Sequence, residues 1–484
     1  MFDGLLLLIL IVHIYIIITV IFLILDNREP ASTFAWVFIF IIIPVGGLAL
    51  YFLIGRNWRI KGRKRRLKYC QLTEEINSLC KPHTNSQAQY LKALKDSSSP
   101  NYKNKLFNLL YHSSDSLLTI NNRIRLYFSG KSKFSDLKAD LENAEKFIHM
   151  EYYIWRNDSL TRQIQDILLR KVSQGVEIRI LYDAIGSLGL RGYYLKRMRR
   201  AGIEIYPYYD FLSPLTIHTL NYRNHRKIAV IDGKIGYTGG MNMGKEYVDG
   251  GRRFDSWYDT HVRLEGESVG VLNSVFATSW VNTTKNNLFN PSYFPKPEQT
   301  YGFLPVQITT SGPDSQWGTI RQLYFSLISS AERSIFIRTP YFIPDESIFT
   351  ALETAALSGL DVKIILAGKP DKKLPFWAAK TYFQKLLQSG VKLYYYQKGF
   401  MHSKAVVVDD YVSSIGSANM DIRSFRLNYE VNTLIYDKNI SGQVSKSFID
   451  DLAECKEFSL SECERTKLLF RFRNSLARLF APLL

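Results

Sequence analysis

Two long apolar runs without a charged residue dominate the amino-terminal end of the chain. Residues 5–25 and residues 34–54 form these runs, each 21 residues long, and the segment between them is mostly polar. About 20 apolar residues are enough for a helix to cross a bilayer. A secretory signal peptide instead has a basic start, a shorter apolar core and a small-residue cleavage site, whereas this chain begins Met-Phe-Asp-Gly. The pattern therefore predicts a hairpin of two transmembrane helices.

A dense basic segment follows the second apolar run. Residues 56–68 contain eight lysines and arginines and no acidic residue. Because basic residues collect on the cytoplasmic side of membrane spans, both ends of the hairpin are expected in the cytoplasm and the turn outside. The same bases can hold anionic lipid headgroups, at about 1 kcal/mol each. Pro44, Gly46 and Gly47 are expected to bend the second span or to let it pack closely on the first.

The rest of the chain alternates strand-like and helix-like patterns, as in an α/β protein, and it repeats itself. The matching segments are 144–151 with 331–338, 175–181 with 359–366, and 202–206 with 390–394. This repeat is too long for a solenoid unit. We therefore expect a duplicated α/β domain, with two mixed β-sheets flanked by helices and a pseudo-twofold axis between the halves.

These patterns divide the chain into five parts. We predict a transmembrane hairpin, a basic juxtamembrane and linker segment, two matching halves and a basic amphipathic C-terminal helix, at residues 1–57, 58–110, 111–300, 301–464 and 465–484. The last helix suits the plane of an anionic membrane, but ordinary packing against the body fits its pattern equally well. Residues 211–217 and 374–377 are further apolar segments that could contact lipid, although tucked-in loops are the simpler expectation.

One constellation of polar residues closes each half of the repeat. The pattern H-x-K-x4-D-x6-G-x-x-N occurs twice at identical spacing, on His225, Lys227, Asp232 and Asn242 and again on His402, Lys404, Asp409 and Asn419. A given histidine meets this pattern by chance less than about once in ten thousand. A single His-x-Lys pair would most simply be the polar face of an edge strand, but two pairs in matching repeats indicate a functional site.

The spacing gives this pattern a physical meaning. Side chains two apart in a strand point to the same face, so each histidine should lie beside its lysine. A tight turn and a second strand then bring the asparagine to the pair. Two such sets that meet across the twofold axis would surround a phosphate with lysines and asparagines, as phosphoryl transfer requires. No carboxylate cluster suits a catalytic metal, so two histidines are expected to act as nucleophile and acid, without metal or cofactor.

The net charge of +18 indicates an anionic partner, either membrane lipid or nucleic acid. No nucleic-acid-binding module is recognisable and the two predicted spans favour lipid, so a nuclease is the less favoured hypothesis. A membrane-binding protein without catalysis would not need two intact motifs. The four cysteines lack the spacing of a zinc site or a disulfide framework, which predicts free thiols in a reducing compartment.

The paired motif resembles that of the phospholipase D superfamily. Residues 416–430 and the amino-terminal hairpin are similar to its cardiolipin synthase branch, and the similarity covers essentially the whole chain. The resemblance implies a phosphohistidine intermediate formed on His225, with His402 as the acid and then the base. It also implies that the carboxylates of Asp259 and Glu430 orient the two histidines.

Two further features of the motif concern its aspartates and a difference between its two copies. Asp232 and Asp409 are grouped with the candidate catalytic residues by their place in the motif, although they are better suited to support the strands. Gly240 lies where the second motif has Ser417, so the first half lacks a hydroxyl at this position.

The activity implied by the resemblance is cardiolipin synthesis, in which a phosphatidyl group passes from one phosphatidylglycerol to another and glycerol is released. The alternative is a phospholipase D or another phosphatidyltransferase with a different acceptor, because the same residues would serve. The expected partners are phosphatidylglycerol and other anionic membrane lipids, and no nucleic acid. The expected location is the bacterial cell membrane, with a multi-pass anchor and a cytoplasmic catalytic body.

Overall fold

The computed structural model describes residues 2–26, 30–55, 87, 102–190, 192–208, 221–251 and 253–480. Its amino-terminal part comprises α1 (Phe2–Leu25), α2 (Pro30–Ile42), α3 (Pro44–Leu50) and the π-helical turn η1 (Tyr51–Gly55). The second apolar run thus forms two helices, because Pro44 at the start of α3 lacks the N–H that would continue α2. Of the two outcomes expected for this run, the interruption at Pro44 is the one that these helices show.

Membrane spans were predicted for both apolar runs. Among the described residues, no helix combines the length and the apolar content that crossing a bilayer requires. The predicted hairpin of two spans is therefore not confirmed. The basic segment at residues 56–68, the apolar segment 211–217, Cys70 and Cys80 lie outside the described residues, while Cys455 and Cys463 are free thiols.

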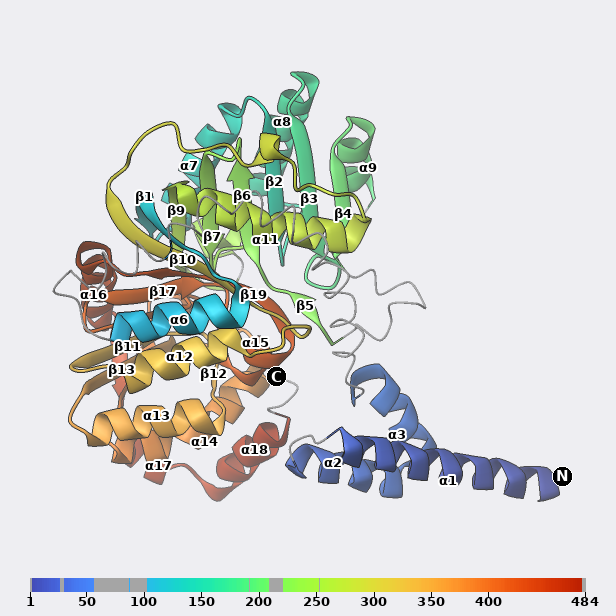
Figure 1. Cartoon of the computed structure of the whole chain (residues 1–484). Helices are drawn as coiled ribbons and strands as arrows, with labels where there is room; N and C mark the ends of the chain where they lie inside the picture. The colour runs from blue at the N-terminus through green and yellow to red at the C-terminus, as the bar shows by residue number, and fades with distance from the viewer. Residues whose placement is uncertain are drawn as a thin grey trace.

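Strands and helices alternate through both halves of the body (Figure 1). The first half contains β1 (Leu118–Tyr127), α7 (Gly130–Glu142), β2 (Phe147–Tyr152), α8 (Ser159–Ser173), β3 (Glu177–Asp183), α9 (Tyr193–Arg200), β4 (Glu204–Tyr208), β5 (Arg223–Asn224), β6 (Lys227–Ile231), β7 (Ile235–Gly239), α10 (Glu246–Asp249), β8 (Trp257–Tyr258), β9 (His261–Gly266) and α11 (Glu267–Thr284). The turn η3 (Pro291–Tyr293) follows.

The second half contains β10 (Phe303–Ser311), α12 (Thr319–Ser329), β11 (Ser334–Arg338), β12 (Phe342–Ile343), α13 (Glu346–Leu357), β13 (Asp361–Ala367), α14 (Lys373–Gln388), β14 (Lys392–Tyr396), β15 (Phe400–Met401), β16 (Ala405–Val408), β17 (Val412–Gly416), β18 (Met420–Asp421), α15 (Ile422–Arg426), β19 (Asn428–Ile435) and α16 (Lys438–Leu452). The chain then continues into β20 (Cys455–Phe458), α17 (Leu460–Glu464) and α18 (Leu468–Leu479).

The two halves have the same strand order. It runs β1-β9-β7-β6-β2-β3-β4 in the first half and β10-β19-β17-β16-β11-β13-β14 in the second. In each half the strands that begin the repeat are parallel, and the motif strands are antiparallel to them. The predicted duplication of a mixed α/β domain is confirmed.

The two predicted sheets are joined into one, which differs from the expectation of two separate sheets. Leu118, at the start of β1, pairs with Gln307 of β10, and Asn122, further along β1, pairs with Gly266 of β9. Because this one strand pairs with both neighbours, the described residues form a continuous sheet of 16 strands. The join removes two open sheet edges at the centre of the molecule.

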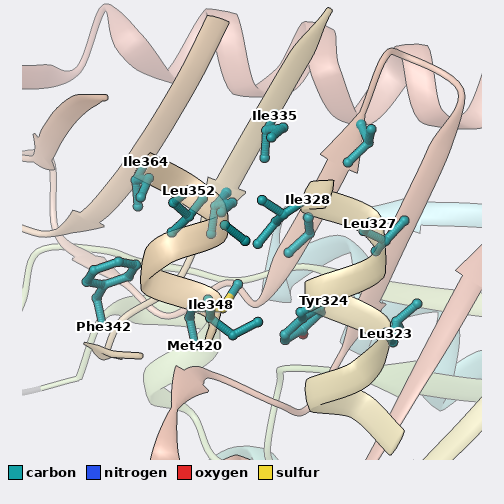
Figure 2. Close-up of a cluster of buried hydrophobic side chains, with 14 of the residues drawn as sticks. Leu323, Tyr324, Leu327, Ile328, Ile335, Phe342, Ile348, Leu352, Ile364 and Met420 are labelled. Atoms are coloured by element: carbon teal, nitrogen blue, oxygen red, sulfur yellow. The ribbon is translucent and has the colours of Figure 1, made fainter. Parts of the chain in front are cut away.

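The core of the second half lies between its sheet and the helices α12 and α13, with α6 (Tyr102–Ser114) beside them (Figure 1). Figure 2 shows Leu327 of α12 and Leu352 of α13 pointing into the layer that Ile335 of β11 enters from the sheet. Phe107 of α6 belongs to the same cluster. The predicted start of the first half at residue 111 therefore falls inside a helix that packs on the second half.

A second buried cluster is shared by both halves. It contains Phe276 and Trp280 of α11, from the first half, and Val407 of β16 and Phe448 of α16, from the second. A common core of this kind holds the two motif strands in a constant relation, because packed interiors deform little.

Candidate active site

Each predicted histidine–lysine pair lies at the start of a buried strand. His225 follows β5 and Lys227 begins β6, while His402 follows β15 and Lys404 precedes β16. All four side chains are buried. Each lysine Nζ donates a hydrogen bond to the backbone carbonyl of the histidine two residues before it. The two halves therefore present the same cation beside the same imidazole.

Short strands exchanged between the halves position the two histidines. β5 pairs in parallel with β19 of the other half, and the His225 backbone N–H donates to the carbonyl of Tyr429 at 2.9 Å. β15 pairs in parallel with β8 of the other half, and the His402 N–H donates to the carbonyl of Tyr258 at 2.8 Å. Each histidine is thus held at its backbone by the opposite half.

The carboxylates expected to orient the histidines also cross between the halves. Nδ1 of His225 lies 3.0 Å from both carboxylate oxygens of Glu430, and Nδ1 of His402 lies 2.6 Å from Oδ2 of Asp259. In each pair the imidazole comes from one half and the carboxylate from the other. With Nδ1 engaged, Nε2 is the ring nitrogen left to react, as in histidines that act as nucleophile or acid.

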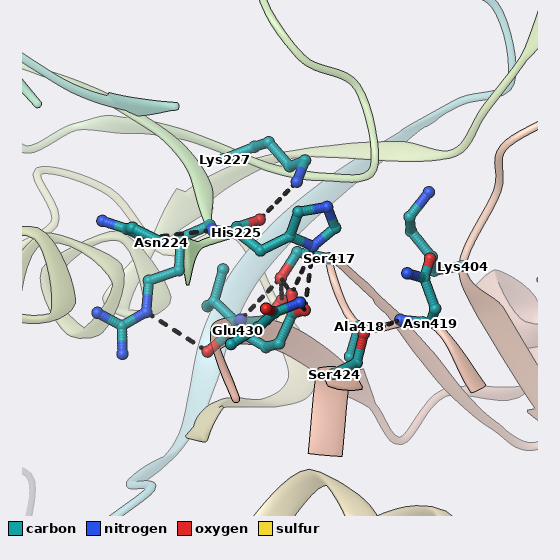
Figure 3. A network of polar contacts seen from close by, with 12 residues as sticks. Asn224, His225, Lys227, Lys404, Ser417, Ala418, Asn419, Ser424 and Glu430 are labelled. Carbon is teal, nitrogen blue, oxygen red and sulfur yellow. Dashed lines mark hydrogen bonds and ion pairs between the residues drawn. The ribbon is translucent and has the colours of Figure 1, made fainter. Parts of the chain in front are cut away.

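The two motif asparagines differ in how far their amides are already used. Oδ1 of Asn242 accepts from the Ile154 N–H at 3.1 Å, and its Nδ2 donates to the Tyr247 hydroxyl at 2.7 Å. Oδ1 of Asn419 is buried and has no hydrogen-bond partner among the described residues. Figure 3 shows Asn419 and Lys404 across from the His225 imidazole, so the amide and the cation of the second half face the histidine of the first.

The sequence of this chain is similar to those of known proteins. A family model described as "Cardiolipin synthase, PLD-like domain" matches residues 137–277 and 324–452, and one described as "Phospholipase_D-nuclease N-terminal" matches residues 8–56. The chain is 40% identical over 464 residues to a cardiolipin synthase of Geobacillus sp. (strain WCH70), which covers 95% of this chain and 90% of the relative. It is 41% identical over 466 residues to a cardiolipin synthase 2 of Bacillus anthracis, which covers 95% of this chain and 88% of the relative.

The chain belongs to the cardiolipin synthase family of phospholipase D-like proteins. A third relative, the cardiolipin synthase of Staphylococcus aureus (strain Mu50 / ATCC 700699), is 38% identical over 483 residues, which cover 98% of this chain and 95% of the relative. The crystal structure of phosphatidylserine synthase from Haemophilus influenzae Rd KW20 has a TM-score of 0.60 at 16% identity and covers 79% of this chain and 100% of that one. At that identity the likeness shows a shared fold.

In this member of the cardiolipin synthase family, Glu430 is surrounded by donors. Besides the His225 imidazole, its carboxylate accepts from the Ser417 hydroxyl and from Nδ2 of Asn428 at 3.0 Å. Burial acts to raise the pKa of Glu430, but His225, Lys227 and Ser417 outweigh it and lower the pKa to about 2. Burial in turn lowers the pKa of His225 to about 4, although the Glu430 charge opposes this. At neutral pH the pair is a carboxylate and a neutral imidazole.

Asp259 has fewer donors than Glu430. Apart from His402, its carboxylate accepts from the Thr260 backbone N–H at 2.8 Å. A Cβ added at Gly240 would lie 2.0 Å from Oδ1 of Asp259, so a serine at that position would collide with this carboxylate. Burial raises the pKa of Asp259 to about 7, although Lys404 opposes the shift, and burial lowers the pKa of His402 well below its ordinary value.

The charged forms of the two motif lysines would be stabilised by a bound anion. Burial lowers the pKa of Lys227 to about 7 and that of Lys404 to about 8, and the charge of Lys404 contributes to the shift at Lys227. Each ammonium has three donors and uses one on a backbone carbonyl. A bound phosphate would accept from the remaining donors and would favour the charged form of both lysines.

Asp232 and Asp409 bind backbone and do not contact the histidines. The Asp232 carboxylate accepts from three successive N–H groups, at residues 145–147, at 2.7 to 2.9 Å. The Asp409 carboxylate accepts from three N–H groups at residues 332–334, at 2.8 to 3.0 Å. Each ties the end of its motif strand to the start of the neighbouring strand, which fits the expected support of the strands and not the grouping with the catalytic residues.

Sequence reasoning did not single out the aromatic walls of the site. The ring of Tyr153 meets the His225 imidazole edge to face, with centroids 4.7 Å apart. Tyr247 and Trp257 lie 5.8 and 5.5 Å from the His402 ring by the same measure. These residues belong to the first half but line both histidines, so no pattern within one repeat could have marked them. Within the described residues, no group of three or more histidine, cysteine or carboxylate side chains is placed to hold a metal ion.

Proposed function

We propose that this chain is a cardiolipin synthase, which moves a phosphatidyl group from one phosphatidylglycerol to another and releases glycerol. The observation that carries the proposal is the crossed pairing of His225 with Glu430 and of His402 with Asp259 beside two buried lysines. Two oriented imidazoles suit a double displacement through a phosphohistidine. The relatives called cardiolipin synthase, 40% and 41% identical over 95% of the chain, support phosphatidylglycerol as the lipid.

The unequal surroundings of the two carboxylates support unequal roles for the histidines. Glu430 stays ionised and holds the Nδ1–H of His225, so Nε2 keeps its lone pair for attack on phosphorus. Asp259 titrates near neutrality and lies 2.6 Å from His402, so this pair can carry one proton near pH 7. His225 is therefore the nucleophile, and His402 is the acid that protonates the leaving glycerol.

The reaction then proceeds in two balanced steps. Nε2 of His225 forms a bond to phosphorus while the bond from phosphorus to the glycerol oxygen breaks, and that oxygen takes the proton from His402. In the second step, His402 removes a proton from a hydroxyl of the second phosphatidylglycerol. Its oxygen bonds to phosphorus, the phosphorus–nitrogen bond breaks, and His225 is regenerated with cardiolipin as product.

The lysines and asparagines bind the phosphate in both steps. Lys227 and Lys404 neutralise the charge that gathers on the oxygens of the phosphoryl group in the transition state. Asn419 and Asn242 contribute amide groups from the two halves. The amide of Asn242 is held in place by Ile154 and Tyr247.

Incubation of the purified protein with phosphatidylglycerol as the sole lipid tests the proposal. Mass spectrometry should detect cardiolipin and free glycerol in equal amounts, and neither product should appear with His225→Ala. Leu357→Ala, which alters an exposed residue at the end of α13, is the matched control and should keep full activity. Phosphatidic acid as the main product would instead indicate a phospholipase D. Cardiolipin absent until another alcohol is added would indicate a different acceptor, and cleavage of an oligonucleotide would indicate a nuclease.

We further propose that α1 and α2 anchor the enzyme in the bacterial cell membrane, with the catalytic body in the cytoplasm. Their large apolar side chains are exposed, among them Ile17, Phe22 and Phe34 at 60, 66 and 73%, and exposed apolar patches of this kind mark membrane contacts. The hairpin of two spans remains a prediction. Alkaline carbonate washing should leave the protein in the membrane fraction, and tags at both termini should resist protease added outside intact cells. Release by carbonate would contradict the anchor, and cleavage of a C-terminal tag would contradict the topology.

A further inference from the structure

The C-terminal helix α18 packs on the body through its polar and small residues. Asn474 and Ala477 are its buried residues, and the helix lies along α14. The guanidinium of Arg473 lies 4.4 Å from the ring centre of Trp377, and that of Arg478 lies 4.7 Å from the ring centre of Tyr382, both on α14. The helix therefore turns two of its basic side chains toward the protein.

The leucines and one phenylalanine of α18 point away from the protein. Together they form a stripe at helical spacing, with exposed fractions of 82, 73, 66, 47 and 75% for Leu468, Leu469, Phe472, Leu476 and Leu479. A helix that packs on a protein core buries such a stripe and exposes its charges. In α18 the arrangement is reversed. The helix does pack on the body, as one of the two alternatives expected, but it does so through its polar and small residues and leaves the apolar stripe exposed.

The positive charge of the helix favours an anionic bilayer as the surface that the stripe contacts. From Lys467 to Leu479 the chain has no acidic residue, and Lys467 and Arg471 are exposed, whereas the other two arginines meet α14. A helix with apolar residues on one face and only basic charges beside them suits the boundary between headgroups and acyl chains of anionic lipid.

The position of α18 relative to the catalytic centre gives the stripe a purpose. The neighbouring helix α14 begins two residues after Asp371, whose carboxylate accepts from the Tyr341 hydroxyl at 2.6 Å. The charge of Asp371 also acts on His402. The amino-terminal end of α14 therefore lies close to the active site, and α18 packs on this same helix.

We propose that the stripe Leu468, Leu469, Phe472, Leu476 and Leu479 lies in the interfacial layer of an anionic bilayer and holds the active site at the level of the lipid headgroups. The choice of an anionic lipid rests on the proposed function, whereas insertion of the stripe does not. In this arrangement α18 lies parallel to the membrane surface, and the enzyme draws its substrate from the lipid layer that its own helix contacts.

Quenching by brominated lipid measures this insertion directly. In the full-length protein with its native cysteines replaced by serine, a fluorophore is attached to Leu476→Cys, or to Leu357→Cys as the control. Leu357 on α13 is an exposed apolar residue, 73% accessible, outside the stripe. In vesicles containing phosphatidylglycerol, the label at position 476 should be quenched and the label at 357 should not. Equal quenching at both positions, or none at 476, would overturn the proposal.

Activity on two forms of the substrate provides the second measurement. The triple variant Leu468→Ser, Phe472→Ser, Leu479→Ser should lose at least about tenfold in turnover on vesicles, since burying each such side chain is worth about a tenfold change in partitioning. Turnover on detergent-dispersed short-chain phosphatidylglycerol should be unchanged, which shows that the variant is folded. Leu357→Ser should match the wild type on both forms. Equal loss on both forms would place the stripe in folding instead, against the proposal.

Cross-linking distinguishes the other possible occupants. A disulfide between Leu476→Cys of two molecules would show that a second copy covers the stripe, and a cross-link to α1 or α2 would show that the amino-terminal helices do so. Either result overturns the proposal. Absence of cardiolipin synthesis together with quenching at position 476 would refute the proposed function while leaving the insertion of the stripe intact.

Discussion

Nδ1 of His225, in the first half, lies 3.0 Å from each carboxylate oxygen of Glu430, in the second half. The reciprocal contact joins His402 to Asp259 at 2.6 Å. Because each imidazole contacts a carboxylate of the other half, both contacts exist only while the two halves are paired. A change that loosens the junction of the halves should therefore disturb both histidines together.

Glu430→Gln should lower kcat by about 10²–10⁴-fold, because the amide keeps the size of the side chain but no longer fixes the Nδ1–H tautomer of His225. Initial rates on phosphatidylglycerol vesicles measure the effect. Asn428→Ala removes one donor to the same carboxylate and leaves its charge, so it should cost less than about tenfold. Similar rates for Glu430→Gln and the wild type would mean that the crossed contact does not position the nucleophile.

The two histidines should be distinguishable by covalent labelling. With a phosphatidyl substrate whose leaving group is nitrophenol, no proton donor is needed, so His402→Ala should still form a phosphohistidine on His225. On phosphatidylglycerol the same variant should lose about 10²–10⁴-fold in rate, because glycerol is a poor leaving group. The measurement is acid-labile, base-stable radiolabel from tail-labelled lipid. Label that persists in His225→Ala and disappears in His402→Ala would reverse the roles.

Acid should destabilise the fold through Glu430. Its folded pKa of about 2 lies below the ordinary value of 4.5, so the folded state binds fewer protons than the unfolded state between these values. The contribution of Glu430 to the free energy of unfolding is therefore present above about pH 4.5 and is lost as the pH falls toward 2. Denaturant unfolding in detergent should show a shallower loss over this range for Glu430→Gln. Identical pH profiles for the two proteins would contradict the lowered pKa.

Asp232→Ala should lower the free energy of unfolding by about 2–4 kcal/mol, because three backbone N–H groups lose their acceptor. Asp409→Ala removes the equivalent acceptor in the second half and should behave alike. The turnover of the folded fraction should remain near that of the wild type in both variants, measured after the unfolded fraction is quantified. A loss of turnover without a loss of stability would place these carboxylates in the chemistry.

Lys133→Met should leave the free energy of unfolding unchanged or raise it by up to about 2 kcal/mol. Lys133 of α7 is fully buried, its Nζ has no hydrogen-bond partner among the described residues, and burial lowers its pKa well below the ordinary value. Lys133 precedes the repeated segment 144–151, and in the second half Ile320 lies at the same distance before the matching segment 331–338. Denaturant unfolding measures the change, with Lys131→Met at an exposed site of the same helix as the control. A clear loss of stability at position 133 alone would show that the amine makes a stabilising contact.

Local spacing accounts for what the sequence by itself determined. Side chains two apart in a strand share a face and a repeat folds alike twice, so the pairing of His225 with Lys227 and of His402 with Lys404 could be predicted, as could the duplicated α/β domain. The bend before Pro44 follows from the missing N–H of one residue. The resemblance to relatives added the roles of Asp259 and Glu430, but not which histidine each would meet.

Only the tertiary structure decided contacts between distant parts of the chain. Glu430 lies 205 positions from His225, and the two meet because β5 and β19 pair across the halves. The raised pKa of Asp259 depends on burial, which its neighbours in the sequence do not reveal. The same holds for the face that α18 turns outward, since an amphipathic pattern marks two faces but does not say which one meets the protein. Local sequence patterns fit more than one arrangement of these elements, and packing between distant parts of the chain decides which arrangement forms.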